Sequence, residues 1–371
     1  MLSSIAIQAP RRNSARADQI GPVFPGSTQR RLESTITVIN TASELVNTSN
    51  QGPGSLITGS SGGVAAATSA GVIDWSPAIT KETGSTQNEP ITKSGSTLFM
   101  TSILDEIVER KKAEVRRASQ AIPLDRLEER LGDAPVVRPF AAELAREPQG
   151  LKANVIAEIK RMSPSAGLIR EDFDPVDIAE RYHASGAKAI SCLTDEHYFG
   201  GKLGYLELVR EAVPLPVLRK DFIVDRYQVA ESRVHGADAV LLIAECLEDE
   251  SLVTCHTYAR SIGLSILVEV HSAENLQRVL DLVAIGPEDN TLLGINNRDL
   301  TRMQTNLGQT ARLLESPGAE IIPRGWVVSE SGIRTPEDLA ALRQFGVHTV
   351  LVGEHLMSQP DPGAALAELL S

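Results

Sequence analysis

Residues 216–243 have the sequence PVLRKDFIVDRYQVAESRVHGADAVLLI and contain one complete repeat of the fold. The apolar, β-rich runs at Pro216–Lys220 and Asp238–Ile243 predict buried strands. The amphipathic spacing over residues 225–235 predicts a helix between them. A strand, a helix and a second strand in this order favour parallel pairing, because the chain must cross back over the sheet before the next strand can join it.

The same alternation continues on both sides of this unit. Six further strands are predicted at Asn154–Lys160, Lys188–Thr194, Ser265–Val270, Thr291–Asn296, Trp326–Glu330 and Thr349–Gly353. Further helices are predicted near residues 175–185, 204–213, 247–262, 272–283, 305–315, 335–345 and 362–370. Eight strands alternating with eight helices predict the α/β class and a closed (β/α)8 TIM barrel. A doubly wound open sheet is the alternative, but no GxGxxG turn follows any of the strands.

Two helical segments precede the first strand. Residues 102–111 begin at a capping residue, Ser102, and space their apolar side chains three and four positions apart. A second short helix is predicted at Leu124–Leu131. We expect these extra N-terminal helices outside the repeat, at one end of the barrel. The predicted catalytic domain therefore spans residues 100–371.

Residues 1–99 differ in composition, with 15 Ser, 12 Thr and 10 Gly. Such segments bury too little apolar surface to offset the entropy of ordering them, so we expect a low-complexity, disordered extension. Three interpretations stay open: an over-extended gene with Met100 as the biological start, a disordered tail, or a targeting segment. The targeting interpretation depends on five arginines and one acid, Asp18, within the first 31 residues. A secretory signal is not expected, and we predict a cytoplasmic protein.

The overall composition disfavours several classes of protein. Of 371 residues, 42% are hydrophobic and 23% are charged, and the formal net charge of -12 disfavours binding to nucleic acid. No apolar run approaches the length of a membrane span. Cys192, Cys246 and Cys255 are too scattered for a disulfide framework or a zinc site, so we expect buried thiols in a reducing compartment.

Polar residues gather where the predicted strands end, which is where barrels of this kind carry their chemistry. They are Glu158, Lys160, Lys220, Glu269, Asn296 and Glu330. Glu158 and Lys160 are two positions apart, so strand alternation places both on one face. Two lysines and three glutamates converging on one barrel mouth predict acid–base chemistry on an anionic substrate.

A second group follows the last two strands. Ser331 and Gly332 come after the seventh strand, and Gly353 and Glu354 come after the eighth. In this class of barrel the backbone N–H groups at these places bind phosphate. Ser163, after the first strand, adds a hydroxyl. We therefore predict a phosphate group on the substrate.

From residue 100 to the C-terminus the chain resembles the indole-3-glycerol-phosphate synthase family of tryptophan biosynthesis. The resemblance is carried by motifs at residues 156–165 (IAEIKRMSPS), 193–201 (LTDEHYFGG), 216–223 (PVLRKDFI), 267–271 (LVEVH), 294–300 (GINNRDL), 329–333 (SESGI) and 352–357 (VGEHLM). Such a set is far more specific than a shared barrel. Residues 1–99 have no counterpart in the family core.

The resemblance implies a carboxy-lyase. Its substrate would be 1-(2-carboxyphenylamino)-1-deoxy-D-ribulose 5-phosphate, which closes its ring and loses CO₂ and water to give indole-3-glycerol phosphate. Lys220 matches the family's general acid and Glu269 its base, while Lys160 would hold the anthranilate carboxylate and share the acid role. The residues that would orient the lysines and the ribulose hydroxyls are Glu158, Asn296 and Glu330.

The resemblance also implies how the substrate is bound. Ser163, Ser331, Gly332, Gly353 and the backbone N–H of Glu354 would hold the phosphate. Phe199, Phe222, Leu241, Leu300 and Arg298 would pack around the anthranilate. No cofactor and no metal are implied, and the expected partner is the small-molecule substrate, without nucleic acid or membrane. Association with other tryptophan-pathway enzymes stays open.

The chain departs from the family pattern at few positions. Met303 and the pair Thr305–Asn306 replace what is often Phe and Val-Asp, where we expect a local effect on the loop. Glu354 stands where the family often has Ser. A carboxylate there must point away from the phosphate.

Other functions and other bases compete with this interpretation. A phosphoribosylanthranilate isomerase would need a cysteine near the end of the first strand as its base, whereas Cys192 is in the middle of a predicted strand. A non-catalytic barrel that binds sugar phosphates would lack at least one of Lys160, Lys220 and Glu269. His197 and His271 follow strands on the rim and could act as bases, but we interpret both as solvated loop histidines.

Overall fold

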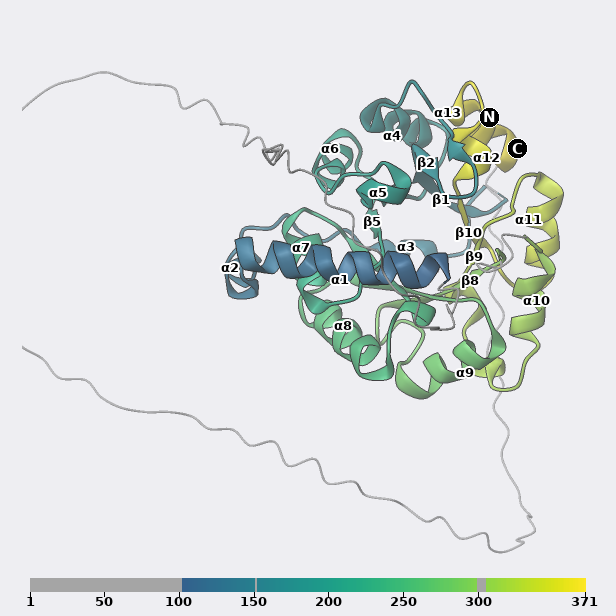
Figure 1. Ribbon diagram of the computed structural model, residues 1–371. Helices are drawn as coiled ribbons and strands as arrows, with labels where there is room; N and C mark the ends of the chain where they lie inside the picture. The colour runs from purple at the N-terminus through teal and green to yellow at the C-terminus, as the bar shows by residue number, and fades with distance from the viewer. Residues whose placement is uncertain (1–101, 151, 299–304) are drawn as a thin grey trace, which may run out of the picture. The chain divides into compact units, whose positions relative to one another are not determined.

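The computed structural model describes residues 102–150, 152–298 and 305–371, so the expectations for residues 1–99, Leu300 and Met303 lie outside the described residues. Eight parallel strands of the described chain close into a barrel surrounded by helices (Figure 1). The strands are β1 (Asn154–Ile159), β4 (Ala189–Leu193), β5 (Val217–Lys220), β6 (Ala239–Ile243), β7 (Ser265–Val270), β8 (Thr291–Asn296), β9 (Val327–Glu330) and β10 (Thr349–Val352). The predicted TIM barrel is confirmed, with each strand end within about one residue of its prediction.

Closure of the barrel comes from β1, which pairs with two neighbours. Ala157 is in register with Ile190 of β4 on one side and with Val352 of β10 on the other. A small antiparallel pair, β2 (Met162–Ser163) and β3 (Gly167–Leu168), follows β1 and was not predicted. Strands of two residues carry no detectable periodicity, so the sequence gives no sign of them.

Helices connect the strands on the outside of the barrel. They are α4 (Pro175–Ala184), α6 (Tyr205–Ala212), α7 (Arg226–Val234), α8 (Asp249–Ser261), α9 (Ala273–Leu282), α10 (Gly308–Leu314), α11 (Pro336–Arg343) and α13 (Pro362–Leu370). Five of them begin at a side-chain cap, from Asp174, Asp225, Ser272, Thr335 and Asp361. No helix of the described ranges is both long and apolar enough to cross a membrane.

Alternation along the strands separates two cores. Ile156, Leu218 and Leu267 belong to the buried cluster inside the barrel. Val155 and Val217, which precede two of them in sequence, belong to the larger cluster between the strands and the helices. Because successive side chains point to opposite faces, each strand contributes to both cores.

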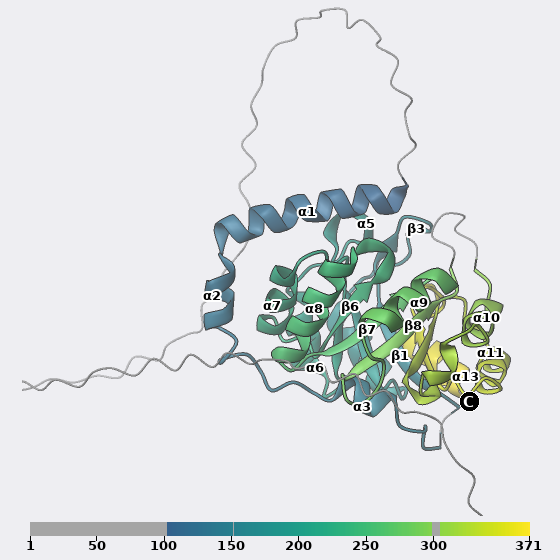
Figure 2. The same ribbon diagram turned by 90° about the horizontal axis from the view of Figure 1, so that it is seen from below.

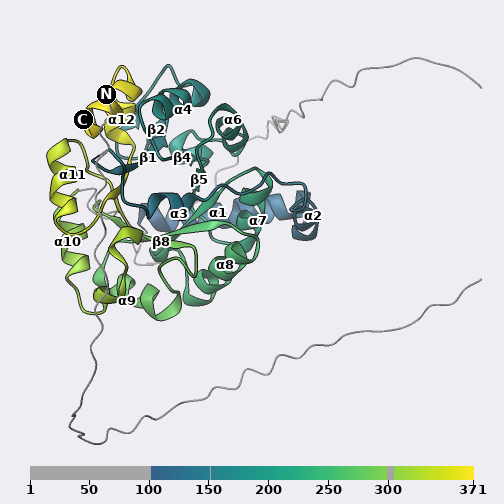
Figure 3. The same ribbon diagram turned by 180° about the vertical axis from the view of Figure 1, so that it is seen from behind.

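The N-terminal end of the barrel is closed by α3 (Phe140–Leu144), a helix that was not predicted (Figure 3). Phe140 and Leu144 are fully buried in the interior cluster. The carbonyl oxygen of Leu144 accepts hydrogen bonds from Asn154 Nδ2 at 2.9 Å and from Thr349 Oγ1 at 2.8 Å. Asn154 and Thr349 are the first residues of β1 and β10, so polar side chains at the starts of these strands hold α3 against the end of the barrel.

At the opposite end, α1 (Ile103–Ala121) crosses over the barrel (Figure 2). It begins with a capping box in which Ser102 and Asp105 exchange hydrogen bonds. The next helix, α2 (Leu124–Glu129), packs against α7 through a small cluster that includes Leu127 and Tyr227. The two helices lie outside the repeat, as expected, and α1 covers the end where the strands finish.

Candidate active site

A pocket opens at the C-terminal end of the barrel, where it is lined by strand ends, by the loops after them and by α1. The strand alternation explains its polar character. Ile156 and Leu218 lie in the interior cluster, and two positions later Glu158 and Lys220 line the pocket. The inward-pointing positions of the strands therefore carry apolar side chains inside the barrel and charged side chains at its C-terminal end.

The structure brings together every site residue that was predicted within the described ranges. Those lining the pocket are Glu158, Lys160, Ser163, Phe199, Lys220, Phe222, Leu241, Glu269, Asn296, Arg298, Glu330, Ser331, Gly332, Gly353 and Glu354. Leu300 lies outside the described residues. The shared pocket establishes their proximity, and their individual roles stay predictions.

Lys220 and Glu269 form an ion pair inside the pocket. Lys220 Nζ lies 2.9 Å from Glu269 Oε2 and 3.7 Å from Glu330 Oε2. Asn296 Nδ2 donates to the other oxygen of Glu269, Oε1, at 2.9 Å. These four residues come from the ends of β5, β7, β9 and β8, so side chains from both sides of β6 meet in one polar cluster at the barrel mouth.

The second lysine pairs with a residue of the same strand end. Lys160 Nζ donates to Glu158 Oε1 at 2.7 Å, and both side chains are almost completely buried. Gly353, directly after β10, makes room for this pair, because a Cβ atom there would overlap the Glu158 carboxylate. Any larger residue would force the carboxylate to move.

The surroundings give three of these groups different charge states. Burial disfavours the Lys220 ammonium, but the charges of Glu269 and Glu330 outweigh burial and raise the pKa of Lys220. Burial also opposes the charge of Glu269, yet the charges of Lys220 and His271 hold its pKa below the usual range. Burial and the charge of Glu269 raise the pKa of Glu330 well above its usual value. At neutral pH the site therefore pairs the Lys220 ammonium with the Glu269 carboxylate.

The loops after β1, β9 and β10 form the wall where phosphate binding was predicted. Ser331 has a left-handed φ of 67°, which is uncommon for a residue with a side chain. Gly353 precedes α12 (Glu354–Met357), whose first N–H groups have no acceptor within the helix. Ser163 and Gly332 line the same wall. Hydroxyl and N–H donors of this kind suit an anion.

Glu354 has a cationic partner across the mouth of the pocket. Arg298 Nη2 lies 2.7 Å from Glu354 Oε2, and Arg298 Nη1 donates to Ser165 Oγ at 3.0 Å. The hydrogen bond from Arg298 lowers the pKa of Glu354, so this carboxylate is ionised and neutralised by the guanidinium. Arg298, expected to pack beside the anthranilate, thus places its guanidinium in polar contacts at the phosphate wall.

An apolar wall completes the pocket. Phe199 and Phe222 lie with their ring centroids 6.1 Å apart, and Leu241 joins them in the lining. Ile103, Leu104 and Ile107 of α1 also line the pocket, and sequence reasoning did not find them. Their apolar spacing predicted the helix, but nothing in that spacing indicates which surface the helix covers.

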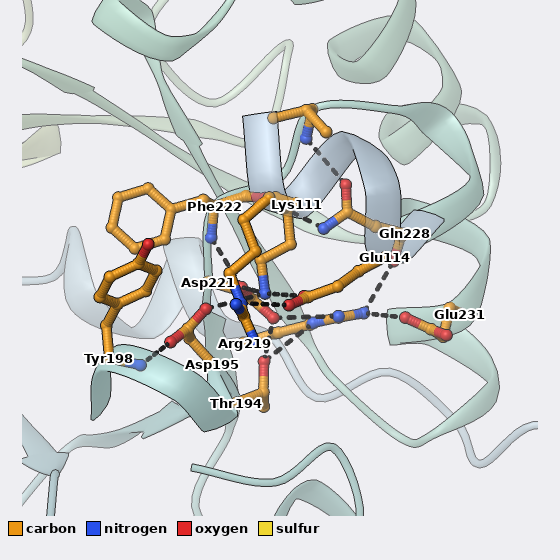
Figure 4. Close-up of polar contacts among 12 residues, drawn as sticks. Lys111, Glu114, Thr194, Asp195, Tyr198, Arg219, Asp221, Phe222, Gln228 and Glu231 are labelled. Atoms are coloured by element: carbon orange, nitrogen blue, oxygen red, sulfur yellow. Dashed lines mark hydrogen bonds and ion pairs between the residues drawn. The ribbon is translucent and has the colours of Figure 1, made fainter. Parts of the chain in front are cut away.

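Lys111 fastens α1 to the rim of the barrel (Figure 4). Its Nζ lies 2.9 Å from Asp195 Oδ2 and 3.0 Å from Asp221 Oδ1, and its side chain is 6% exposed. Glu114, one turn further along α1, adds a contact at 2.8 Å. Burial disfavours the ammonium, but the charges of Asp221 and Asp195 outweigh burial and raise the pKa of Lys111.

The same cluster reaches the strand that carries Lys220. Arg219 Nη2 donates to Asp221 Oδ2 at 3.1 Å, and Arg219 Nη1 lies 2.8 Å from Glu231 Oε2 of α7 (Figure 4). Lys220 stands between Arg219 and Asp221 in the sequence. The covering helix and the end of β5 are therefore joined through one buried set of charges.

The two rim histidines differ in their surroundings. His197, in α5 (Glu196–Phe199), is exposed, as expected. The interpretation of His271 as a solvated loop histidine is wrong, because Glu245 pairs with it at 3.0 Å and its side chain is only 11% exposed. Glu245 follows the end of β6, so the strand-end signal used elsewhere could have identified it.

The family model for indole-3-glycerol phosphate synthase matches residues 104–369, which include nearly all of the described chain. The chain belongs to this family. Proteins named indole-3-glycerol phosphate synthase from Rhodopirellula baltica and Acidithiobacillus ferrooxidans are 47% and 49% identical to it over 270 and 271 residues. Each alignment covers 73% of this chain and 99% of the relative. A relative from Geobacillus thermodenitrificans is 47% identical over 267 residues, covering 72% of this chain and 96% of that protein.

Membership of the synthase family disfavours the alternative of a phosphoribosylanthranilate isomerase. The surroundings of Cys192 argue against that alternative as well. Cys192 is fully buried within β4. Burial raises the pKa of its thiol to about 12, so the thiol does not ionise near neutral pH.

Proposed function

We propose that the pocket converts 1-(2-carboxyphenylamino)-1-deoxy-D-ribulose 5-phosphate into indole-3-glycerol phosphate, CO₂ and water, as a carboxy-lyase of tryptophan biosynthesis. The observation that carries the proposal is the Lys220–Glu269 pair, 2.9 Å apart in a barrel mouth that also holds Lys160. Relatives named for this synthesis, at 47% and 49% identity, support the same reaction.

Lys220 would act as the general acid of ring closure. As the aromatic carbon attacks the ribulose carbonyl, negative charge develops on the carbonyl oxygen, and an ammonium can supply the proton. The ammonium form of Lys220 is favoured by Glu269 and Glu330, so the donor is charged before substrate arrives. Lys160, held by Glu158 at 2.7 Å, would bind the anthranilate carboxylate.

Loss of CO₂ then restores the aromatic ring and leaves a hydroxyl at the former carbonyl carbon. Dehydration requires an acid for this hydroxyl and a base for the neighbouring ring carbon. Lys160 shares the acid role, and Glu269 is the base. Asn296 supports Glu269 through its hydrogen bond at 2.9 Å, while Glu330, which lines the same pocket, would orient a ribulose hydroxyl.

Binding would use both walls of the pocket. Ser163, Ser331, Gly332 and the N–H groups at Gly353 and Glu354 would hold the phosphate by hydrogen bonds and by the favourable end of a helix turn. The residues assigned to the anthranilate are Phe199, Phe222 and Leu241, together with the α1 side chains Ile103, Leu104 and Ile107. The phosphate of the substrate would therefore lie against the wall of N–H and hydroxyl donors, and its anthranilate ring against the apolar wall.

The wider assignments follow from the same reaction. We place the catalytic domain in residues 100–371 and treat residues 1–99 as dispensable for turnover. The partner is a small phosphate-bearing molecule, with no role for nucleic acid or membrane. A biosynthetic reaction on such a metabolite suits the cytoplasm.

The experiment that tests the proposal is direct turnover of the purified protein. Incubation with the carboxyphenylamino substrate should produce indole fluorescence together with CO₂ in equal amounts. A non-catalytic sugar-phosphate sensor would bind the substrate without either product. Binding without turnover would therefore reject the proposed reaction while leaving the fold intact.

A further inference from the structure

Glu245 and His271 form a largely buried pair beside the acid–base cluster. Glu245 lies in the turn η1 (Ala244–Cys246) after β6, and His271 directly follows β7. His271 Nδ1 is 3.0 Å from Glu245 Oε2. The other carboxylate oxygen, Oε1, accepts the backbone N–H of His271 at 2.9 Å and Asn275 Nδ2 at 3.0 Å. Both carboxylate oxygens are engaged, so the position of the imidazole is fixed from one side.

The second imidazole nitrogen faces Glu269. His271 Nε2 lies 3.4 Å from Glu269 Oε1, and within the described ranges this buried nitrogen has no hydrogen-bond partner. Glu269 Oε1 also accepts from Asn296, while Oε2 contacts Lys220. Glu269 thus has an ammonium on one side and an imidazole on the other.

The charges around His271 favour its protonated form. Burial disfavours the imidazolium, but the hydrogen bond to Glu245 and the charges of Glu269 and Glu245 raise the pKa of His271 above its usual value. The opposing charge is Lys220. The titratable groups that face Glu269 are Lys220, His271, Glu330 and the Cys246 thiol of η1.

The proposed reaction changes the charge of Lys220 but not that of His271. When Lys220 gives its proton to the carbonyl oxygen, it becomes a neutral amine, and Glu269 loses its nearest positive partner. Glu269 is 2% exposed, so water cannot replace that partner. Without another cation, the buried carboxylate would be driven to take up a proton before the step in which it acts as a base.

We propose that His271, held as an imidazolium by Glu245, is a positioning residue that keeps Glu269 ionised and oriented after Lys220 has donated its proton. The inference rests on the proposed function and deepens it. His271 touches no reacting atom in this account. It acts through Glu269 and should therefore affect only the steps that Glu269 performs.

Single-turnover experiments separate those steps. His271→Asn removes the cation, while the Asn amide can still donate to Glu245. Release of CO₂, which follows ring closure by Lys220, should stay within about twofold of the parent, whereas formation of the indole should slow by roughly tenfold. In the pH–rate profile of indole formation, the fall in rate on the acid side should move to higher pH, because loss of the imidazolium raises the pKa of Glu269.

Glu245→Gln provides a second variant if His271→Asn folds poorly. Its amide oxygen can still accept the N–H groups of His271 and Asn275, but the loss of negative charge lowers the pKa of His271. Indole formation in this variant should match the parent at low pH, where the imidazole is protonated, and fall as the pH rises. A purely structural role for Glu245 would give no such dependence.

His197→Asn is the matched control, since His197 is an exposed rim histidine of α5. It should leave both steps and the melting temperature unchanged. Equal slowing of CO₂ release and indole formation in His271→Asn would overturn the inference, as would no slowing of either. Failure of the parent to form indole would instead reject the proposed function, so the two failures are distinguishable.

Discussion

Replacement of Lys220 by Met tests the assignment of the general acid. Met keeps most of the aliphatic stem but removes the ammonium that lies 2.9 Å from Glu269 Oε2. General acid catalysis contributes about 10²–10⁴-fold, so kcat should fall by that factor. Substrate affinity should fall less, because the phosphate wall and Lys160 are unchanged. Lys220→Arg should also be poor, since guanidinium is a much weaker acid with a planar shape.

The same replacement should destabilise the fold in a pH-dependent way. Removing one partner of a buried ion pair costs about 3–5 kcal/mol, and we expect the lower end because Asn296 and His271 still face Glu269. In the parent the pKa of Glu269 is lowered, so its contribution to stability is present above the unfolded pKa of about 4.3 and is lost as the pH falls below it. The variant loses this contribution, so its deficit should be constant above about pH 4.3 and shrink as the pH falls further below that value.

Two measurements check these expectations together. Indole fluorescence gives kcat and KM, and urea unfolding at pH 3 and pH 7 gives the free energy of unfolding. The double variant Lys220→Met/Glu269→Gln removes the uncompensated charge, so it should recover stability without recovering turnover. If Lys220→Met folds normally and keeps turnover within about threefold of the parent, Lys220 is not the acid, and Lys160 becomes the leading candidate.

Three other outcomes are expected. Lys111→Met should lower the free energy of unfolding by about 3–5 kcal/mol, because buried Asp195 and Asp221 lose their shared cation. It should also raise KM, because α1 is held less firmly over the pocket. The control Lys112→Met, at an exposed neighbouring lysine, should lower the free energy of unfolding by less than about 0.5 kcal/mol. A chain that starts at Met100 should keep the full-length turnover and melting temperature, and a markedly higher KM would show that residues 1–99 contribute to the site. Exhaustive chelation should leave turnover unchanged, because the assigned acids and bases are all side chains; recovery of lost activity by an added divalent metal would contradict that mechanism.

The barrel and its polar rim could be predicted from the sequence because both depend on local periodicity. Each strand is long enough for its apolar run to be recognised in the sequence. A charged residue such as Lys220 or Glu269 is then recognised by its position at the end of that run. In a closed parallel barrel all strand ends of one kind meet at one edge, so sequence positions translate directly into proximity. The sequence does not predict which of these polar residues contact one another, because those contacts depend on the stagger of the strands around the barrel.

The parts that could not be predicted depend on tertiary contacts. Helix α3, which closes the N-terminal end of the barrel, has only five residues and so shows no clear periodicity in the sequence. Its side chains Phe140 and Leu144 are buried through contacts with the barrel interior, which are distant in sequence. Lys111 is one of several charged residues on α1, and its neighbour Lys112 has the same local sequence context. Only the docking of α1 against Asp195 and Asp221 makes one lysine buried and leaves the other exposed.

Glu354 shows why a departure from a family pattern has to be interpreted together with its partner. Taken alone, a carboxylate beside the predicted phosphate wall would repel a phosphate and argue against binding there. Arg298, whose guanidinium lies 2.7 Å from Glu354 and bonds Ser165 on the β1 loop, balances that charge within the wall. The pair is neutral as a unit, so the N–H groups after β9 and β10 can still attract an anion. The contact with Glu354 therefore holds Arg298 beside the loops after β1 and β10, whereas Phe199, Phe222 and α1 line the apolar wall of the pocket.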